Sequence, residues 1–313
     1  MGSKGGLKVW SMLWLASAVM AWVLSGCAWI DTQQRAKVYR PTAGTMADWK
    51  PITDHDEALW LEMPPARPGG QAQRLRAVWI PSDNPVAPSV LYLHGTFRNV
   101  FQNRPKIAAI HAAGFSVLAV DYRGWGESTT LLPSEESIME DAEVAWAALT
   151  HRAPKPDSRV IFGHSMGSGV AVELALRHRD PLAYGALVVE SAMTSMPDMV
   201  RDINPFGIVL VPLVTQQFAS IDKIGSIDAP KWFLSGTADH TVPPQQTQRL
   251  YEAAPGPKHI EMFDGGSHSG LHKEFEQRYQ AVWHDVAASL RDRVRPAETT
   301  AAGSANTAPA ALH

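Results

Sequence analysis

Short runs of apolar residues recur along the middle of the chain, separated by stretches of mixed polarity. Residues 57–63 and 73–80 alternate apolar and polar positions and are joined by a turn rich in proline and glycine. This spacing predicts a β-hairpin at the start of a sheet. Six further runs are almost continuously apolar, which is typical of strands covered on both faces. They are residues 89–95, 115–123, 159–163, 185–190, 231–236 and 259–263.

Helical patterns fill the intervals between these runs. Residues 134–151 begin with Ser-Glu-Glu-Ser and repeat apolar positions at helical spacing from Ile138 to Leu149. Strands that alternate with helices predict an α/β fold with a mostly parallel, doubly wound sheet of eight strands. Ligands bind such sheets beyond the carboxyl ends of the strands. Further helices are predicted over residues 166–178, 243–253 and 271–290.

A serine stands between two glycines where a predicted strand passes into a predicted helix. Residues 163–167 read Gly-His-Ser-Met-Gly, and the strand–turn–helix context of this Gly-x-Ser-x-Gly motif is that of a nucleophile elbow. The turn strains the serine backbone so that its hydroxyl stands clear of the sheet, and flanking side chains would collide with the strand and helix. The helix also directs its partial positive end at this point. We therefore predict Ser165 as a nucleophile.

A serine hydroxyl reacts only when a base takes its proton. Of the 12 histidines, His268 fits best because it follows the last apolar run in a glycine-rich loop that can reach back over the sheet edge. His272 is the alternative, although it falls inside a predicted helix. His240 adjoins the candidate acid Asp239, and a neighbouring side chain rarely turns back to bond it.

The imidazole in turn needs an acid that fixes its tautomer and stabilises its charged form. Asp239 follows the apolar run 231–236 directly and is the predicted acid. Two rivals remain open. Glu190 ends the preceding apolar run, and Asp264 lies closer to the histidine along the chain.

Acyl transfer also needs two donors for the developing oxyanion. The backbone N–H of Met166, the residue after the nucleophile, is one predicted donor. The second is expected in the loop after residues 89–95, where His-Gly-Thr presents the N–H of Thr96, with Phe97 as the nearest alternative.

Together these strings resemble the α/β-hydrolase superfamily, in particular its single-domain members described as serine-aminopeptidase-like. The resemblance covers about residues 54–290, within a predicted hydrolase domain of residues 54–295, and rests on LYLHGT, AVDYRGWGES, GHSMGSGVA, SGTADHTVPP and FDGGSHS. It implies the eight-stranded fold, the chain order Ser165, Asp239, His268 for the catalytic triad, and a small lid over about residues 191–229. The Gly124 turn is implied to shape the floor near the site.

The function that follows is a serine hydrolase that cleaves an ester through an acyl-enzyme, with thioester and amide bonds left open. An acyltransferase on the same triad and a non-catalytic envelope scaffold are the alternatives. The apolar stretch 203–214 either lines an acyl pocket or packs on the core, which leaves a small-molecule ester or lipid-like substrate as the expectation.

Composition and charge narrow the partners. The chain has 313 residues with 28 basic and 31 acidic side chains. The sequence contains no stripe of basic residues of the kind that indicates nucleic-acid binding. A single cysteine, Cys27, excludes an intramolecular disulfide. The motifs imply no metal and no organic cofactor.

The amino terminus reads as an export signal. Lys4 and Lys8 precede the apolar run 9–24, which is shorter than the roughly 20 residues that span a bilayer. The following Leu-Ser-Gly-Cys resembles the lipobox of bacterial lipoproteins, which implies cleavage after residue 26 and a lipidated Cys27. In a Gram-negative host, the absence of Asp at position 28 favours the outer membrane, facing the periplasm.

The remaining ends of the chain are predicted to lie outside the folded domain. Residues 27–53 are polar with little periodicity and are expected to form a tether. Residues 296–313 are rich in Ala, Thr, Ser and Pro and offer almost no bulky apolar side chain to bury, so a disordered tail is predicted there.

Overall fold

The computed structural model describes residues 25–65, 70–204 and 206–294. Residues 1–24 of the predicted signal and the whole predicted tail, 296–313, lie outside the described residues. None of the described helices is both long and apolar enough to cross a bilayer.

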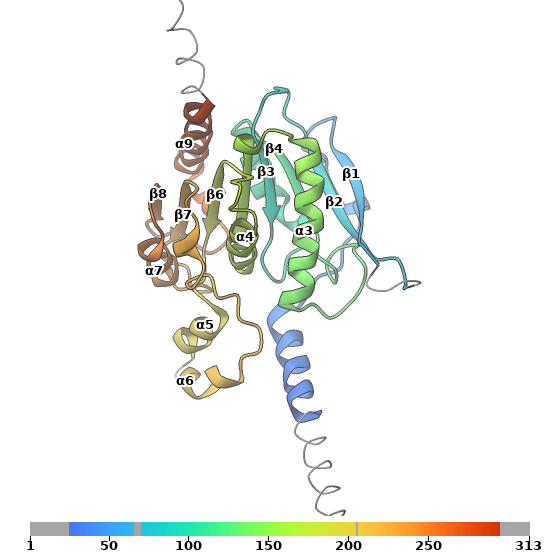
Figure 1. The fold of residues 1–313 in the computed structure, drawn as a ribbon, viewed down its shortest axis with the longest axis vertical. Helices are drawn as coiled ribbons and strands as arrows, with labels where there is room; N and C mark the ends of the chain where they lie inside the picture. The colour runs from blue at the N-terminus through green and yellow to red at the C-terminus, as the bar shows by residue number, and fades with distance from the viewer. Residues whose placement is uncertain (1–24, 66–69, 205, 295–313) are drawn as a thin grey trace, which may run out of the picture.

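Eight strands form one sheet in the order β1-β2-β4-β3-β5-β6-β7-β8 (Figure 1). β2 pairs antiparallel with both β1 and β4, and the other neighbours are parallel. The predicted fold class is thereby confirmed. The strands are β1 (Glu57–Glu62), β2 (Arg74–Ile80), β3 (Ser89–Leu93), β4 (Ser116–Val120), β5 (Arg159–His164), β6 (Ala186–Glu190), β7 (Lys231–Gly236) and β8 (Lys258–Phe263).

Helices cover both faces of the sheet, and each face has its own apolar core. On one face pack α3, α4 and α7, and on the other pack α2, α8 and α9. Their bounds are α2 (Val100–Ala112), α3 (Glu135–Arg152), α4 (Met166–Arg177), α7 (Pro244–Ala253), α8 (Leu271–Glu274) and α9 (Glu276–Val294), with α5 (Met196–Ile203) and α6 (Gly207–Leu210) between β6 and β7. Short 3-10 turns occupy Met46–Asp48, Pro156–Ser158, Val211–Leu213 and Ile224–Ser226.

The parallel register aligns the carboxyl ends of the central strands. Leu93 of β3 lies opposite Gly163 of β5, and His164 of β5 lies opposite Glu190 of β6. β7 and β8 end together, with Gly236 opposite Phe263. The loops that follow these strands therefore emerge side by side at one edge of the sheet.

Two helical predictions need correction. The predicted helix 271–290 is divided into α8 and α9 at Phe275, whose backbone leaves the helical region at φ −134°. Helix α2 is absent from the sequence-based prediction because its buried face includes the polar residues Asn103 and Lys106, and Pro105 interrupts the pattern.

The region predicted as a tether is largely structured. Residues 25–39 are helical, and Tyr39 at the end of this helix is fully buried. Arg35 donates a hydrogen bond from Nε to the carbonyl of Pro133 at 2.7 Å. The polar side chains that hide the helical periodicity are thus the ones that attach this segment to the domain.

The segment expected to form a lid, residues 191–229, contains α5 and α6. None of the described residues of its apolar stretch, 203–214, lines the cavity around Ser165 or belongs to the apolar core, so the structure supports neither reading of this stretch. Six of its side chains are between 41% and 75% exposed to solvent: Ile203, Phe206, Ile208, Val209, Leu210 and Leu213. In contrast, Met193 and Met199 are buried in the core.

Candidate functional site

Ser165 sits at the sharp turn between β5 and α4. Its backbone has φ 57° and ψ −125°, a left-handed conformation that is strained for a residue other than glycine. The Ser165 N–H donates to the carbonyl of Glu190 at 2.9 Å, so β6 holds the turn from the side. Met166 is the first residue of α4, where backbone N–H groups lack partners within the helix.

The two glycines of the motif are required by the space around them. A Cβ on Gly163 would lie 2.2 Å from the carbonyl oxygen of Gly167, and a Cβ on Gly167 would lie 2.2 Å from that of Leu93. A Cβ on Gly95, in the loop after β3, would lie 2.9 Å from the Cβ of Ser165. The backbone of this loop therefore passes directly against the serine.

Three side chains from separate loops meet at this turn. His268 Nε2 lies 3.1 Å from Ser165 Oγ, and His268 Nδ1 lies 2.8 Å from Asp239 Oδ2. The Asp239 side chain is fully buried, whereas the His268 side chain is 17% exposed. The structure thus brings together the three residues predicted as nucleophile, base and acid.

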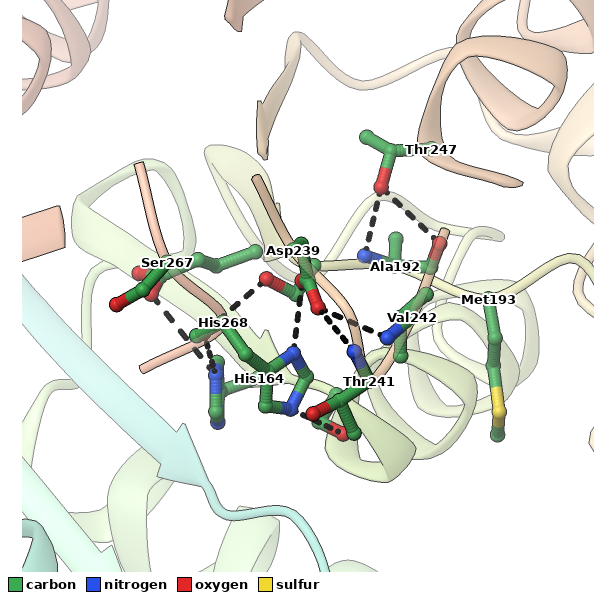
Figure 2. Close-up of polar contacts among 12 residues, drawn as sticks. His164, Ala192, Met193, Asp239, Thr241, Val242, Thr247, Ser267 and His268 are labelled. Carbon is green, nitrogen blue, oxygen red and sulfur yellow. Dashed lines mark hydrogen bonds and ion pairs between the residues drawn. The ribbon is translucent and has the colours of Figure 1, made fainter. Parts of the chain in front are cut away.

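The carboxylate of Asp239 is fixed from two sides. Its Oδ1 accepts the backbone N–H groups of Thr241 and Val242, both at 2.9 Å, while Oδ2 faces the imidazole (Figure 2). Burial acts to raise the pKa of Asp239, but the hydrogen bond and charge of His268 and the N–H of Val242 outweigh it and hold the pKa below its ordinary value. Asp239 is therefore anionic at neutral pH.

The loop that carries His268 is held at its own backbone. His164 Nε2 lies 2.9 Å from the carbonyl oxygen of His268, and Ser191 Oγ donates to the same oxygen at 3.2 Å. Burial, together with the charges of Lys106 and His268, lowers the pKa of His164 well below its usual range. A neutral His164 ring with its proton on Nε2 serves as the donor. Sequence reasoning noted His164 only as part of the elbow.

Glu190, one rival for the acid, is engaged elsewhere. Its carboxylate forms a buried ion pair with Lys106 of α2 and accepts the hydroxyl of Tyr279 at 2.9 Å. Asp264, the other rival, accepts the hydroxyl of Thr237 at 3.2 Å and lies exposed. Neither carboxylate bonds His268 in the part of the chain that the structure describes.

The alternative base, His272, also lies away from the serine. It belongs to α8, and only 8% of the residue is exposed. Burial, with the charges of Lys106 and Lys273, lowers the pKa of His272 to about 4. Its ring packs edge-on against Tyr279.

A cavity of about 300 Å³ opens beside Ser165. Both Thr96 and Phe97 line it, so the structure keeps both candidates for the second oxyanion donor at the site. Phe97 adopts a left-handed φ of 69°, which turns the loop sharply after Thr96. The other lining residues are predominantly polar: Gly95, Arg98, Asn103, His164, Thr241, Ser267, His268 and Ser269.

Below this loop lies the buried pair His94 and Asp121. His94 Nδ1 is 2.6 Å from the carbonyl oxygen of Gly95, and its Nε2 is 3.5 Å from Asp121 Oδ1. Burial lowers the pKa of His94 to about 4 and raises the pKa of Asp121 to about 7. Burial therefore favours the neutral form of both groups, which support the loop from beneath as a polar contact.

Comparison with known proteins identifies the family. The sequence model described as serine aminopeptidase, S33, matches residues 84–222, a range that includes Ser165 and ends before Asp239. The uncharacterized protein MT2364 of Mycobacterium tuberculosis is 31% identical over 255 residues, covering 80% of this chain and 86% of that protein. The α/β-hydrolase domain-containing protein WAV2 of Arabidopsis thaliana is 29% identical over 253 residues, covering 74% and 79% of the two chains.

The chain belongs to the α/β-hydrolase family. Among solved structures, the esterase Pf2001 of Pyrococcus furiosus superimposes on this α/β-hydrolase with a TM-score of 0.60 at 19% identity, covering 78% of this chain and 94% of that one. At this identity the likeness shows the fold. Family membership supports hydrolase activity in general, and the chemistry of this α/β-hydrolase must be argued from its own residues.

Within the described residues of this α/β-hydrolase, no group of three or more His, Cys, Asp or Glu side chains is arranged to hold a metal ion. The groups that meet at the site are the serine, imidazole and carboxylate side chains and the backbone N–H groups around them.

Proposed function

We propose that this protein is a serine hydrolase that cleaves an ester bond through an acyl-enzyme intermediate. The observation that carries the proposal is the continuous set of contacts from Asp239 through His268 to Ser165. Thioester and amide bonds react by the same chemistry and stay open as substrates. The match to the family model described as serine aminopeptidase is the reason to keep an amide bond among the candidate substrates.

In the proposed mechanism, Ser165 Oγ attacks the carbonyl carbon while His268 Nε2 accepts the hydroxyl proton. Asp239 keeps the Nδ1–H of His268 in place and stabilises the imidazolium. The backbone N–H groups of Met166 and Thr96 stabilise the oxyanion, each contributing about 3 kcal/mol to lowering the barrier. The tetrahedral intermediate then breaks down and expels the alcohol, which takes the proton from His268. Water then attacks the carbonyl carbon of the acyl-enzyme while His268 accepts a proton from it. The Ser165 oxygen leaves and takes this proton back from His268, which releases the acid.

A fluorophosphonate probe tests the nucleophile. We expect the wild-type protein to be labelled and Ser165→Ala to remain unlabelled, with both proteins folded as judged by circular dichroism. A panel of 4-nitrophenyl esters of increasing chain length then tests ester cleavage. The proposal is refuted if the folded wild-type protein neither reacts with the probe nor cleaves any ester of the panel.

An acyltransferase on the same triad differs only in the acceptor that replaces water. Product analysis with a candidate alcohol or amine separates the two, because transfer gives a new ester or amide and hydrolysis gives the free acid. A non-catalytic envelope scaffold predicts instead that Ser165→Ala retains full biological function.

We further propose that the protein is attached to the bacterial envelope through a lipid on Cys27, at the outer membrane facing the periplasm. Cys27 is exposed and precedes most of the helix 25–39 that leads into the domain, which supports this attachment. Metabolic labelling with a palmitate analogue should mark the wild-type protein and not Cys27→Ala. Equal labelling of both, or equal release of both from membranes without detergent, contradicts the proposal.

A further inference from the structure

A second cavity, of about 240 Å³, adjoins the one that contains Ser165. The two cavities share Arg98, Asn103, Ser267 and Ser269 as lining residues, so they meet beside the nucleophile. The second cavity is otherwise lined by Gln102, Pro105, Lys106, Gly270, His272 and Lys273.

The charge of this second cavity is one-sided. Arg98, Lys106 and Lys273 line it, and no aspartate or glutamate is among its lining residues. Glu190 pairs with Lys106 beneath the cavity. Glu274, near the rim, already accepts hydrogen bonds from the N–H and hydroxyl of Ser267.

Arg98 and Lys273 remain available to a ligand. Both side chains are exposed, and in the described parts of the chain no carboxylate forms an ion pair with either of them. Cations that line a concave surface without matching carboxylates create a positive local potential and attract anions. The planar guanidinium of Arg98 also matches the geometry of a carboxylate or phosphate group.

His272 provides a second, independent sign of a missing partner. The residue is only 8% exposed, and both of its ring nitrogens lack a hydrogen-bond partner among the described residues. Buried polar atoms in folded proteins are nearly always hydrogen-bonded, so this ring beside the cavity can still accept a further partner. The positive charges of Lys106, Lys273 and Arg98 act on this ring, and the negative charge of Glu274 opposes them.

We propose that this cavity holds an anionic group, a carboxylate or a phosphate, that is part of the substrate whose ester Ser165 attacks. This inference rests on the proposed hydrolase function. It narrows the substrate class to esters that carry an oxyanion within reach of Arg98 and Lys273. The three cations that line the second cavity agree with such a substrate better than with a long acyl chain inserted there.

Two esters with six-carbon acyl chains test the inference. The mono-4-nitrophenyl ester of adipic acid carries a terminal carboxylate, and 4-nitrophenyl hexanoate does not. We expect the ratio of kcat/KM for the adipate ester over the hexanoate ester to fall about fivefold to tenfold in Arg98→Gln and in Lys273→Gln, since each removes a cation that would bind the carboxylate. Lys155→Gln, which removes the same charge near the opposite ends of the strands, should leave the ratio unchanged.

The outcomes separate the two proposals. If the folded wild type cleaves neither ester and also fails to react with the fluorophosphonate probe, the hydrolase proposal fails and the anion site fails with it. If it cleaves the hexanoate ester and the ratio is the same in wild type, Arg98→Gln and Lys273→Gln, the anion site is refuted while the hydrolase stands. As a check that needs no variant, the wild-type ratio should fall as NaCl rises from 50 to about 500 mM. A salt-independent ratio also overturns the anion site.

A different observation carries a second proposal, on how the protein sits at a membrane. The exposed apolar side chains of residues 203–213 form an apolar tip on α5, α6 and the turn that follows, and this tip projects from the same end of the molecule as helix 25–39 (Figure 1). Contiguous exposed apolar surface of this kind is rare on soluble monomers and marks contact with a membrane or a partner.

The helix 25–39 is tied directly to the chain beside the apolar tip. Asp31 accepts hydrogen bonds from Thr215 at 2.7 Å and from Gln216 at 3.1 Å, and Gln34 accepts the N–H of Thr215 at 3.1 Å. Tyr39 donates to Gln216 at 2.6 Å. These bonds fix the orientation of the apolar tip relative to the start of the helix.

The start of helix 25–39 indicates what the apolar tip contacts. Cys27, the proposed site of the lipid, lies at the exposed start of the helix. Whatever anchors this end at a bilayer brings the apolar tip to the same bilayer. We propose that the apolar tip inserts into the lipid surface and holds the domain in a defined orientation.

Spin labels at two matched positions test this orientation in the full-length protein reconstituted in phosphatidylcholine–phosphatidylglycerol vesicles. Val209, in the apolar tip, and Val86, before β3, are 71% and 75% exposed, so Val209→Cys and Val86→Cys should fold equally well. The unsubstituted protein, treated in the same way, measures any label on Cys27 that does not carry the proposed lipid. We expect the label at 209 to be more accessible to oxygen than to a water-soluble nickel chelate, and the label at 86 to show the reverse. Similar accessibility at both positions refutes the proposal.

Discussion

The imidazole of His164 contacts the backbone of His268, with Nε2 of the former 2.9 Å from the carbonyl oxygen of the latter. The residue before the proposed nucleophile thus holds the loop that carries the proposed base. Two positions 104 residues apart are fixed together at the point where a proton must pass. This contact leads to the first of five predictions.

Replacing His164 should slow catalysis because the loop that carries His268 is then held less firmly in position. In His164→Ala, the His268 loop loses a donor, and we expect kcat to fall about 10- to 100-fold because small displacements of a catalytic group carry such costs. KM should change little. His164→Gln, whose amide can donate to the same carbonyl, should recover part of the rate. Unchanged kcat in a folded His164→Ala protein contradicts the assignment.

Asp239→Asn should lower kcat about 10⁴-fold with KM little affected, because an amide no longer stabilises the imidazolium or fixes its tautomer. The measurement is steady-state hydrolysis of the best 4-nitrophenyl ester of the panel. Asp264→Asn is the matched control. It changes an exposed carboxylate in the loop after β8, which also carries His268, and should stay within about twofold of wild type.

Glu190→Gln should lower the stability of the folded protein. The substitution leaves Lys106 buried without its counter-charge, and we expect the free energy of unfolding to fall by about 3–5 kcal/mol in urea titrations. Glu57→Gln breaks an exposed ion pair with Arg152 and should cost no more than about 1 kcal/mol. If Glu190→Gln instead abolished turnover at unchanged stability, Glu190 would be the better candidate for the acid.

Gly167→Ala should prevent correct folding of the elbow. The new Cβ would lie 2.2 Å from the carbonyl oxygen of Leu93, and neither α4 nor β3 can move without disturbing the sheet. We expect insoluble protein or loss of at least about 3 kcal/mol of stability, as in overpacked cores. Gly225→Ala, with 3.8 Å to its nearest neighbour, should be tolerated. Soluble, active Gly167→Ala protein would show that the elbow is more adaptable than described.

Asp121→Asn should change how stability depends on pH. The folded-state pKa of Asp121 is raised to about 7 by burial, above the ordinary 3.8, so the folded state binds a proton that the unfolded state releases between these values. The contribution of Asp121 is therefore complete below pH 3.8, is lost progressively as the pH rises to about 7, and changes no further above that pH. Relative to wild type, Asp121→Asn should gain about 2–3 kcal/mol between pH 5 and pH 8. A constant difference across this range refutes the raised pKa.

The strand pattern was predictable from the sequence because each buried strand is a short apolar run. All eight runs correspond to strands, with ends that differ by three residues or fewer. Helix α2 escaped prediction because its inward face carries Lys106 and Asn103, whose burial depends on partners distant in the chain. Residues 25–39 were missed for a related reason, since polar side chains attach that helix to the domain.

The candidate site divides in a similar way. The glycines around Ser165 and the loop positions of Asp239 and His268 are local features that a motif reveals. The choice of Asp239 over Glu190 depends on which carboxylate the imidazole meets, and that is visible only when Lys106 is seen to occupy Glu190. The role of His164 at the carbonyl of His268 leaves no local signal at all.

The sequence alone determined the positions of the eight strands along the chain and the sharp turn at Ser165, because apolar periodicity and the steric demands of glycine are properties of neighbouring residues. Tertiary structure decided which carboxylate faces His268, the cationic lining beside the serine and the exposure of residues 203–213. These features depend on contacts between positions far apart in the chain, and the sheet register that creates those contacts is formed only when the whole domain packs.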